Sequence, residues 1–284
     1  MKNVFRDVVE DFGEEWTLYD YSKNQKENKF LFNKYFDIFP KKINTKNLKC
    51  LDIGCGSGRF GRVLASKVNH LTLIDPSIKA LKVAKKNLQK YKNVTFLNRS
   101  VSSMNLKKKS FNFIYSLGVL HHVPNIDLAL KDIYKILKED GFFLIYLYYN
   151  FDNKPFYYKI IWQLSEILRF FICRLPFFIK KKICLLITIF VYLPIVSFSK
   201  LLKKINLNID FIPLSQYHDK SFYVMKTDTL DRFGTRYESR FSKKQIELKL
   251  KKVGFKKIIF SNQEPYWHAI AWKNLKTKSN KTFK

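Results

Sequence analysis

The sequence predicts an α/β fold in which a doubly wound, mainly parallel sheet carries an apolar helical insertion. Three observations support this prediction. Short apolar runs alternate with helix-like segments from residue 48 to residue 148, the pattern of repeated β-α-β units. The last run, residues 142–148 (FFLIYLY), is apolar throughout, as expected for a strand buried on both faces of a parallel sheet. After it, residues 151–212 lose the alternation and become rich in Phe, Ile, Leu and Tyr.

The chain before the first strand is predicted to be a helical extension, residues 1–44. Residues 1–21 are acidic and aromatic and show no strong period. Residues 22–39 are predicted to form a helix that Ser22 caps, and Pro40 ends it because a proline disfavours helical backbone in the residue before it.

The core sheet and its first helices are expected in residues 45–150. Ser77 is a candidate helix cap, and Gly141 follows a helix-like segment as a stop signal would. The predicted strands are 48–53, 70–74, 93–97, 111–117 and 142–148, and the predicted helices are 59–67, 77–91 and 126–137.

Residues 151–220 are predicted to be the helical insertion. Its longest uncharged run, residues 183–199, would span ~26 Å as an α-helix, against a ~30 Å hydrocarbon core. Pro194 would also kink it. A helical lid or a membrane-facing surface is therefore favoured over a membrane span, and a cap that packs on the sheet remains the alternative.

The α/β pattern resumes in residues 221–273, which are expected to complete the core sheet. Ser242 and Gln245 have the spacing of a capping box, so a helix is predicted from there to about Val253, with Gly254 as its stop. Residues 255–261 and 267–273 are predicted strands, and residues 274–284 form a basic tail.

Composition narrows the class of protein. The 284 residues are 46% hydrophobic, which is enough for a packed core, and the four cysteines lack the spacing of a zinc site or a disulfide framework. The formal net charge is +30. Such a charge favours anionic partners, either nucleic acid or an anionic membrane surface, unless the lysines simply cover solvated faces.

The stretch of residues 48–61 (LKCLDIGCGSGRFG) is the main candidate for a ligand site, because its glycines permit close approach of the backbone. Two interpretations compete. Residues 56–61 match the dinucleotide pattern G-x-G-x-x-G, with Asp75 as the ribose-binding acid. Asp52 favours the second, S-adenosylmethionine, because a carboxylate at the strand end would repel a pyrophosphate but suits a ligand with ammonium and sulfonium charges.

These motifs together resemble the class I S-adenosylmethionine-dependent methyltransferases, in the style of the ubiquinone-biosynthesis group. The resemblance rests on LDIGCGSGRFG, on Asp75 in LIDPS and on SLGVLHHVPN at residues 116–125. It covers residues 45–148 strongly and 240–273 moderately. It implies a Rossmann-like seven-stranded sheet with an antiparallel last strand.

The resemblance also implies which residues contact the cofactor. The glycine loop would hold its methionine part, Asp75 and Pro76 its ribose and adenine, and the end of the fourth strand would face the sulfonium. Ser100 stands where the family usually has an acid that contacts adenine, and Asn112 stands where it usually has Asp. The candidate cofactor-binding residues are Asp52, Gly54, Cys55, Gly56, Gly58, Asp75, Pro76, Ser100, Val101, Ser116 and Leu117.

A general base is needed only where the methyl acceptor must lose a proton. His121 and His122 lie just beyond the fourth strand and are the candidates, although the pair could equally be a structural part of the loop. Adjacent side chains point apart, so at most one of them is expected to face the pocket. His218 and His268 are further candidates, and Tyr217, Tyr237 and Tyr266 could shape a pocket.

The expected function is therefore methyl transfer from S-adenosylmethionine to a small-molecule, lipid or lipid-linked glycan acceptor, without a metal. An RNA methyltransferase and a non-catalytic S-adenosylmethionine-binding module are the alternatives. Against the RNA alternative, Ser116, Leu117, Gly118 and Val119 stand where a base-flipping motif would follow the fourth strand. The expected location is cytoplasmic, with the protein peripheral at the inner face of the membrane.

Overall fold

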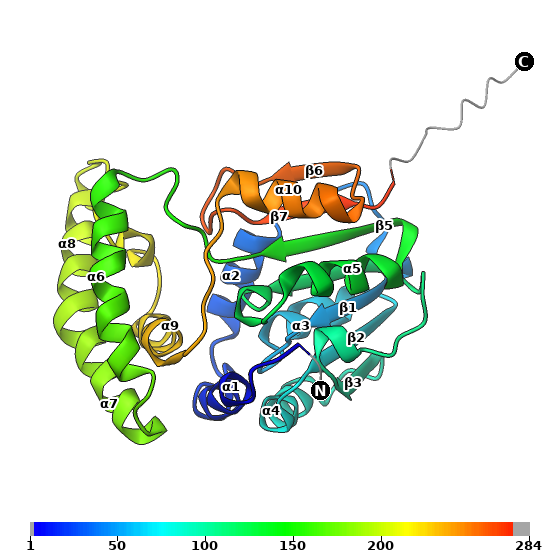
Figure 1. The fold of residues 1–284 in the computed structure, drawn as a ribbon, viewed down its shortest axis with the longest axis horizontal. Helices are drawn as coiled ribbons and strands as arrows, with labels where there is room; N and C mark the ends of the chain where they lie inside the picture. Colours follow the sequence, from blue (N-terminus) through cyan, green and yellow to red (C-terminus); the bar gives the residue numbers. More distant parts are fainter. Residues whose placement is uncertain (1–2, 275–284) are drawn as a thin grey trace, which may run out of the picture.

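The computed structural model describes residues 3–274 and contains one mixed sheet with the strand order β3-β2-β1-β4-β5-β7-β6 (Figure 1). The strands β1 to β5 are parallel, and β7 runs antiparallel to both β5 and β6. The predicted seven-stranded α/β class with an antiparallel last strand is thereby confirmed. The strands are β1 Lys49–Ile53, β2 His70–Asp75, β3 Val94–Asn98, β4 Phe111–Leu117, β5 Leu137–Tyr146, β6 Lys257–Phe260 and β7 Ala269–Trp272.

Ten α-helices accompany the sheet in the described part of the chain. They are α1 Arg6–Leu18, α2 Gln25–Tyr35, α3 Arg59–Leu64, α4 Ile78–Leu88, α5 Ile126–Ile136, α6 Phe156–Ile172, α7 Phe177–Ile187, α8 Leu193–Lys204, α9 Phe222–Gly234 and α10 Lys243–Val253. The predicted cap of α4 is present, because the Ser77 hydroxyl accepts from the Ala80 N–H. The capping box of Ser242 and Gln245 is also present, and Gly254 ends α10 with a positive φ of 117°.

The sheet is buried on both faces, as the apolar strands predict. One core contains Leu71, Leu88 and Phe113, and the other contains Ile114 and Leu130. Since β1 pairs with β2 on one side and β4 on the other, the chain changes direction across the sheet at β1. The carboxyl ends of these strands therefore meet at the switch point where open α/β sheets bind ligands.

Three local expectations differ from the structure. Ser22 does not cap α2; its hydroxyl and N–H donate to Asp20, and α2 begins at Gln25. Gly141 is not a helix stop but lies inside β5, since α5 already ends at Ile136. The helix α1 lies in residues 1–21, where the sequence shows no strong hydrophobic period and no helix was predicted. The tail proposed for residues 274–284 lies outside the described residues except for Asn274.

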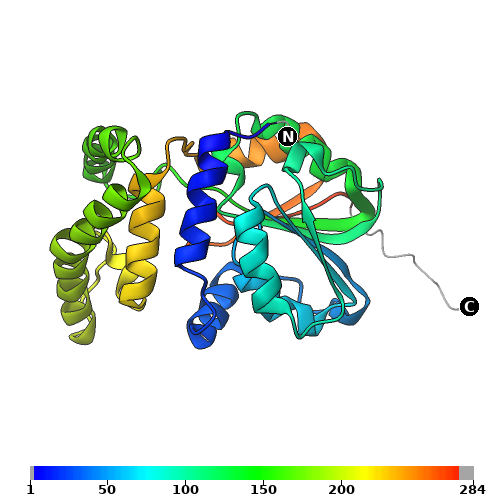
Figure 2. The same cartoon turned by 90° about the horizontal axis from the view of Figure 1, so that it is seen from below.

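The helices α6, α7, α8 and α9 form a helical layer beside the sheet (Figure 2). In it, α9 packs against α6 and α7, and on its other side it contacts α1, which lies between the layer and α4. The helices α7 and α8 form one continuous helical segment, Phe177–Lys204, through a π-helical stretch at Thr188–Tyr192. This segment has 28 residues and contains an 18-residue stretch with a mean hydropathy of 2.1, so by length and composition alone it could cross a membrane.

The π-helical stretch keeps one face of this long segment in contact with the protein. The residues Cys184, Thr188, Tyr192 and Val196 recur every four positions, and all four are buried. A regular α-helix has 3.6 residues per turn, so a strict four-residue repeat would rotate away from its partner surface. A wider π turn compensates for that rotation. Pro194 is the second residue of α8, which directly follows this π-helical stretch.

Candidate cofactor and acceptor site

The loop after β1 has the conformation that its glycines predict. Gly54, Gly56 and Gly58 adopt positive φ angles of 71°, 53° and 73°. At Gly56, a Cβ atom would lie 2.6 Å from the Trp16 ring, so α1 rests directly on this loop. The loop is thus held in a left-handed, close-packed form at the start of α3.

Asp75 at the end of β2 organises the next part of the site. Its Oδ2 accepts from the Gly56 N–H at 3.0 Å and its Oδ1 accepts from the Ser77 N–H at 2.8 Å. Burial raises the pKa of Asp75 to about 6, and these two N–H groups oppose that rise. A carboxylate can accept about four hydrogen bonds, so Asp75 retains capacity for ligand hydroxyls.

Asp52 lies beneath the loop. The Tyr115 hydroxyl donates to its Oδ2 at 2.8 Å. Burial raises the pKa of Asp52 to about 7, against the lowering effect of the Tyr115 hydrogen bond. Asp52 is therefore a buried carboxyl group beneath the loop that changes its charge near neutral pH.

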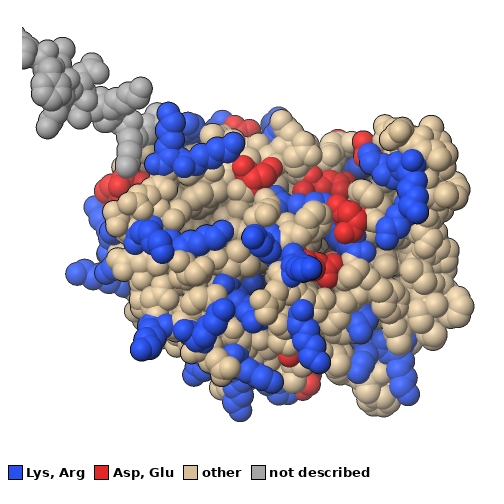
Figure 3. All heavy atoms as spheres, turned by 180° about the vertical axis from the view of Figure 1, so that it is seen from behind, with Lys and Arg blue, Asp and Glu red and all other residues tan. Residues whose placement is uncertain are grey.

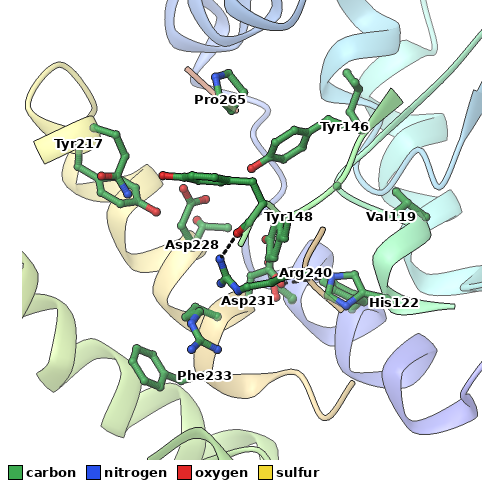
Figure 4. Close-up of a pocket in the computed structure, with 18 of the residues that line it drawn as sticks. Val119, His122, Tyr146, Tyr148, Tyr217, Asp228, Asp231, Phe233, Arg240 and Pro265 are labelled. Atoms are coloured by element: carbon green, nitrogen blue, oxygen red, sulfur yellow. Dashed lines mark hydrogen bonds and ion pairs between the residues drawn. The ribbon is translucent and has the colours of Figure 1, made fainter. Parts of the chain in front are cut away.

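A cavity of about 610 Å³ lies at the switch point and extends to the helical layer (Figure 4). Of the predicted site residues, it is lined by Gly54, Asp75, Pro76, Leu117 and His122. The structure thus joins the glycine loop, Asp75 and one of the two neighbouring histidines in a single cavity.

Several predicted residues lie behind the wall of this cavity. The Ser100 hydroxyl is 2.7 Å from that of Ser103, and the Ser116 hydroxyl donates to the Ile53 carbonyl at 3.2 Å. Cys55 and Val101 are buried, and Gly58 packs against Leu88. Their contacts shape the loops around the cavity.

The two histidines of the pair differ in what they face. The Nδ1 of His122 is 2.7 Å from the Tyr237 carbonyl, so Nδ1–H donates and a neutral ring keeps the lone pair on Nε2. That Nε2 is buried without a hydrogen-bond partner among the described residues, and it lies 3.8 Å from Asp231 Oδ1. Figure 4 shows His122 and Asp231 together at one end of the cavity.

Asp231 is itself positioned by a tyrosine. The Tyr148 hydroxyl donates a short hydrogen bond to Asp231 Oδ2. Burial raises the pKa of Asp231, although the charge of His122 and this hydrogen bond oppose the rise. His122, Asp231 and Tyr148 therefore form a connected set from a loop, α9 and the chain after β5.

His121 faces the interior of the protein. Its ring stacks on Tyr148 with centroids 3.8 Å apart, and both ring nitrogens are buried without hydrogen-bond partners among residues 3–274. Burial lowers the pKa of His121 well below its usual value. His121 therefore supports Tyr148, whereas His122 lines the cavity.

The other candidate histidines lie outside the cavity wall. His268 is held between the Pro265 carbonyl and Asp37, at 2.7 and 2.6 Å, in a structural position. His218 Nδ1 is 2.9 Å from the Ser215 carbonyl. The predicted Tyr217 and Tyr266 do line the cavity, whereas Tyr237 contributes its carbonyl to His122.

The sequence analysis missed the contribution of α1. Its side chains extend along the cavity: Phe12 lies 5.0 Å from the His122 ring, and Trp16 covers Gly56. Val8, Phe12 and Trp16 recur every four residues, which is a helical signal that the interleaved acidic residues obscured.

The sequence analysis also missed charged residues on the cavity wall. Glu15 is buried there and Asp228 is partly buried, and desolvation raises the pKa of both carboxyl groups. Arg59, at the start of α3, lies over the Trp16 and Tyr21 rings. No local motif signals Glu15 or Asp228, because each needs the tertiary fold to reach the cavity.

This donor set fits S-adenosylmethionine. Asp75 can accept hydrogen bonds from ribose hydroxyls, and the carboxyl oxygens of Glu15 and Asp228 on the cavity wall can accept from an ammonium group. When ionised, Asp52 below the loop disfavours a pyrophosphate at the same place, and this favours S-adenosylmethionine of the two cofactors considered for the glycine loop.

Comparison with known proteins identifies the family. The family model described as "Methyltransferase domain" matches residues 44–185, half of the chain. The chain therefore belongs to the methyltransferase domain family, and its class is that of the S-adenosylmethionine-dependent methyltransferases with the class I fold.

Individual relatives agree with this assignment. The chain is 34% identical to a ubiquinone biosynthesis O-methyltransferase of Pelagibacter ubique, over 35% of this chain and 42% of that protein. It is 32% identical to a ubiquinone/menaquinone biosynthesis C-methyltransferase of Rickettsia felis, over 38% and 47% of the two chains. The chain thus spans about half of the length of the curated relatives that it matches.

A solved structure matches over more of the chain. A S-adenosylmethionine-dependent methyltransferase from Thermotoga maritima, described as a possible histamine N-methyltransferase, aligns over 94% of this chain and all of that chain. The TM-score is 0.50 and the identity 15%, so the likeness concerns the fold alone.

Proposed function

We propose that the protein transfers a methyl group from S-adenosylmethionine to a hydroxyl group of a small acceptor with an apolar body. The observation that carries this proposal is the buried Nε2 of His122, whose lone pair lies on the same cavity as the glycine loop and Asp75. A lipid or a lipid-linked glycan has this kind of apolar body.

The cofactor half of the site is formed by β1, β2 and α1. Asp75 is placed to accept hydrogen bonds from ribose hydroxyls, and the left-handed loop brings its backbone close to a ligand. Glu15 and Asp228 place carboxyl oxygens on the cavity wall that can accept hydrogen bonds from the ammonium group. When bound, S-adenosylmethionine supplies an electrophilic methyl group on sulfur.

The acceptor half centres on His122. Its Nε2 accepts the proton that an acceptor hydroxyl loses as the oxygen forms its bond to the methyl carbon. The Tyr237 carbonyl holds the ring in the required tautomer through Nδ1–H. Asp231 stabilises the imidazolium that results, and the Tyr148 hydroxyl keeps Asp231 in place.

The rest of the cavity wall supports an apolar acceptor. The apolar side chains on this wall include Val8 and Phe12 of α1, Leu168 of α6, and Val191 and Ile195 of the α7–α8 segment. Burying such an acceptor against these side chains contributes about 25 cal/mol per Å² of apolar surface. The names of the relatives, which include quinone-pathway methyltransferases and a sterol 4-C-methyltransferase of Caenorhabditis elegans, are consistent with acceptors of this type.

Methyl-labelled S-adenosylmethionine tests the proposal. The purified protein is incubated with it and with cell extract separated into lipid, glycan and RNA fractions. We expect label in the lipid fraction or in lipid-linked glycan, and its loss with His122→Gln while cofactor binding by calorimetry persists. Label confined to RNA, or cofactor binding without transfer to any fraction, would contradict the proposal and favour one of the alternatives considered from the sequence.

A further inference from the structure

The polarity of α6 is reversed relative to a helix on the surface of a water-soluble domain. Its polar residues Ser165, Glu166 and Arg169 face α9, where Arg232 donates to Ser165 at 2.8 Å and to Glu166 at 2.5 Å. The opposite face of the helix carries Leu164 and Ile167, which are 62% and 60% exposed. A soluble helix places its apolar stripe inward, so this arrangement requires another partner for the outward stripe.

The continuous helix of α7 and α8 adds to the same kind of surface. Its inward residues include Lys180, which is buried and forms an ion pair with Asp11 at 2.6 Å and donates to the Gly234 carbonyl. On the side turned away from this contact, Phe190 is 72% exposed and Leu201 is 59% exposed. We define the outer face as these outward apolar residues of the two helices: Ile160, Leu164, Ile167, Phe171, Leu186, Phe190, Phe198 and Leu201.

The side chains around the outer face are mainly basic, which favours an anionic partner. Residues 156–207 carry nine Lys and Arg but only one acid, Glu166, which faces α9. Of the basic residues, Lys200, Lys203 and Lys204 are exposed beside the outer residues of α8. Figure 3 shows the edge of the molecule formed by the helical layer as mostly tan surface, bordered by blue side chains.

We propose that the outer face docks onto an anionic lipid bilayer, with its apolar side chains in the interfacial region and the surrounding lysines at the lipid headgroups. Binding to such an interface requires apolar residues flanked by cations, because the cations are attracted to the anionic headgroups. Docking is favoured over a membrane span because the inward side of α7–α8 holds Lys180 paired with Asp11 and packs on α9. This inference concerns a surface and does not depend on the proposed reaction.

Vesicle binding tests this surface directly. The full chain is sedimented with vesicles of phosphatidylcholine alone and with vesicles in which part of it is replaced by phosphatidylglycerol. We expect binding to the anionic vesicles to be at least about tenfold tighter and to weaken as salt is raised. Equal binding to both vesicle types, or to neither, would overturn the proposal.

Matched variants assign the binding to the outer face. The variant Leu164→Ser, Ile167→Ser, Phe190→Ser should bind vesicles at least about tenfold more weakly, because each change removes apolar surface that the bilayer would bury. Its folding is checked by cofactor binding and circular dichroism. Unchanged vesicle affinity in this variant would place the membrane contact elsewhere and overturn the proposal.

A control variant and a measurement of mass separate the remaining explanations. Ile78, Leu128 and Leu248 are exposed apolar residues of α4, α5 and α10, away from the helical layer, so their substitution by Ser should leave vesicle binding unchanged. An equal loss of vesicle affinity in this control variant would show that the binding is nonspecific and would overturn the proposal. The free protein could also sediment as a dimer that does not bind vesicles and that the outer-face variant dissociates. That result would show that the outer face binds a second copy of the chain, and it would overturn the proposal.

Discussion

The Nε2 atom of His122 lies 3.8 Å from Oδ1 of Asp231, although 109 positions separate them along the chain. The Tyr237 carbonyl holds the other ring nitrogen of His122 and the Tyr148 hydroxyl holds the other oxygen of Asp231. These two contacts fix the orientation of both side chains, and both residues line the cavity that reaches the glycine loop. This relationship gives the proposed base its tautomer and its neighbouring negative charge.

Substitution of His122 by Gln should lower the rate of methyl transfer by about 100- to 10,000-fold, the usual contribution of a general base. Gln cannot take up the proton at the Nε2 position, whereas cofactor binding at the loop should stay intact. Single-turnover rates with labelled cofactor measure the first effect and calorimetry measures the second. His218→Gln is the matched control, because His218 does not line the cavity and should leave the rate unchanged. A His122→Gln enzyme with the full rate would remove the base from the proposal.

Substitution of Asp75 by Asn should weaken binding of S-adenosylmethionine by about 10- to 100-fold, since a hydrogen bond to a charged group contributes about 1.5–3 kcal/mol. The carboxylate already accepts from the Gly56 and Ser77 N–H groups. An amide has a single acceptor oxygen, so it cannot keep both contacts and serve a ribose. Calorimetric titration with the cofactor checks the result, with Asp132→Asn on α5 as control. Unchanged affinity would exclude Asp75 from the nucleoside contact.

Truncation of Trp16 to Ala should weaken cofactor binding, because the ring covers Gly56 and closes the cavity from the side of α1. Truncating a fully buried aromatic side chain lowers the free energy of unfolding by about 3 kcal/mol or more, so a smaller loss of stability is expected for the partly buried Trp16. The exposed Glu10 on the same helix provides the control as Glu10→Ala. Titration of both variants with the cofactor measures the difference, and equal affinities would mean that α1 does not cover the bound ligand.

The cofactor half of the candidate site could be predicted from the sequence, but most of its acceptor half could not. The strands, the glycine loop and Asp75 follow from local signals, because an apolar run, a turn and a strand-end acid are neighbours in the chain. The setting of His122 depends on Asp231 and Tyr237, which only tertiary packing brings to it. Asp231 has no motif of its own on α9, so its role is visible only in the fold.

Stability should fall as the pH rises through the window set by Asp52. Burial raises the folded-state pKa of Asp52 from 3.8 to about 7. Between about pH 4 and pH 7 the unfolded chain has released this proton and the folded chain still holds it, so the free energy of unfolding decreases as the pH increases. Asp52→Asn removes the titration, and its stability relative to wild type should increase by a few kcal/mol across this window, at about 1.4 kcal/mol per pKa unit.

Urea denaturation of both proteins at either end of the window measures this difference. The control is Glu247→Gln on the surface of α10. It should change the free energy of unfolding by a small and similar amount at both ends of the pH window, because the ion pair of Glu247 with Lys251 is exposed. A constant difference between Asp52→Asn and wild type at all pH values would contradict the raised pKa.

Glu166→Gln should destabilise the attachment of α6 to α9. Glu166 accepts from Arg232 at 2.5 Å and from Arg169 Nε at 3.0 Å. Burial alone would raise the pKa of Glu166, but the hydrogen bond from Arg169 and the charge of Arg232 lower it below its usual value. The carboxylate therefore contributes stability above its unfolded pKa, and this contribution is lost as the pH falls through the lowered folded pKa.

The variant should lose about 2 kcal/mol at neutral pH, the range for hydrogen bonds to a charged group, and the loss should shrink in acid. Arg232 would keep its charge in a largely buried place with a weaker partner, since its remaining carboxylate, Glu238, lies 3.7 Å away. Thermal unfolding at neutral and acidic pH measures the change, and limited proteolysis between α6 and α7 reports whether α6 has loosened. If the variant is as stable as wild type at neutral pH, the polar contacts of Glu166 do not hold α6 on α9. Apolar packing between the two helices would then fix the orientation of α6.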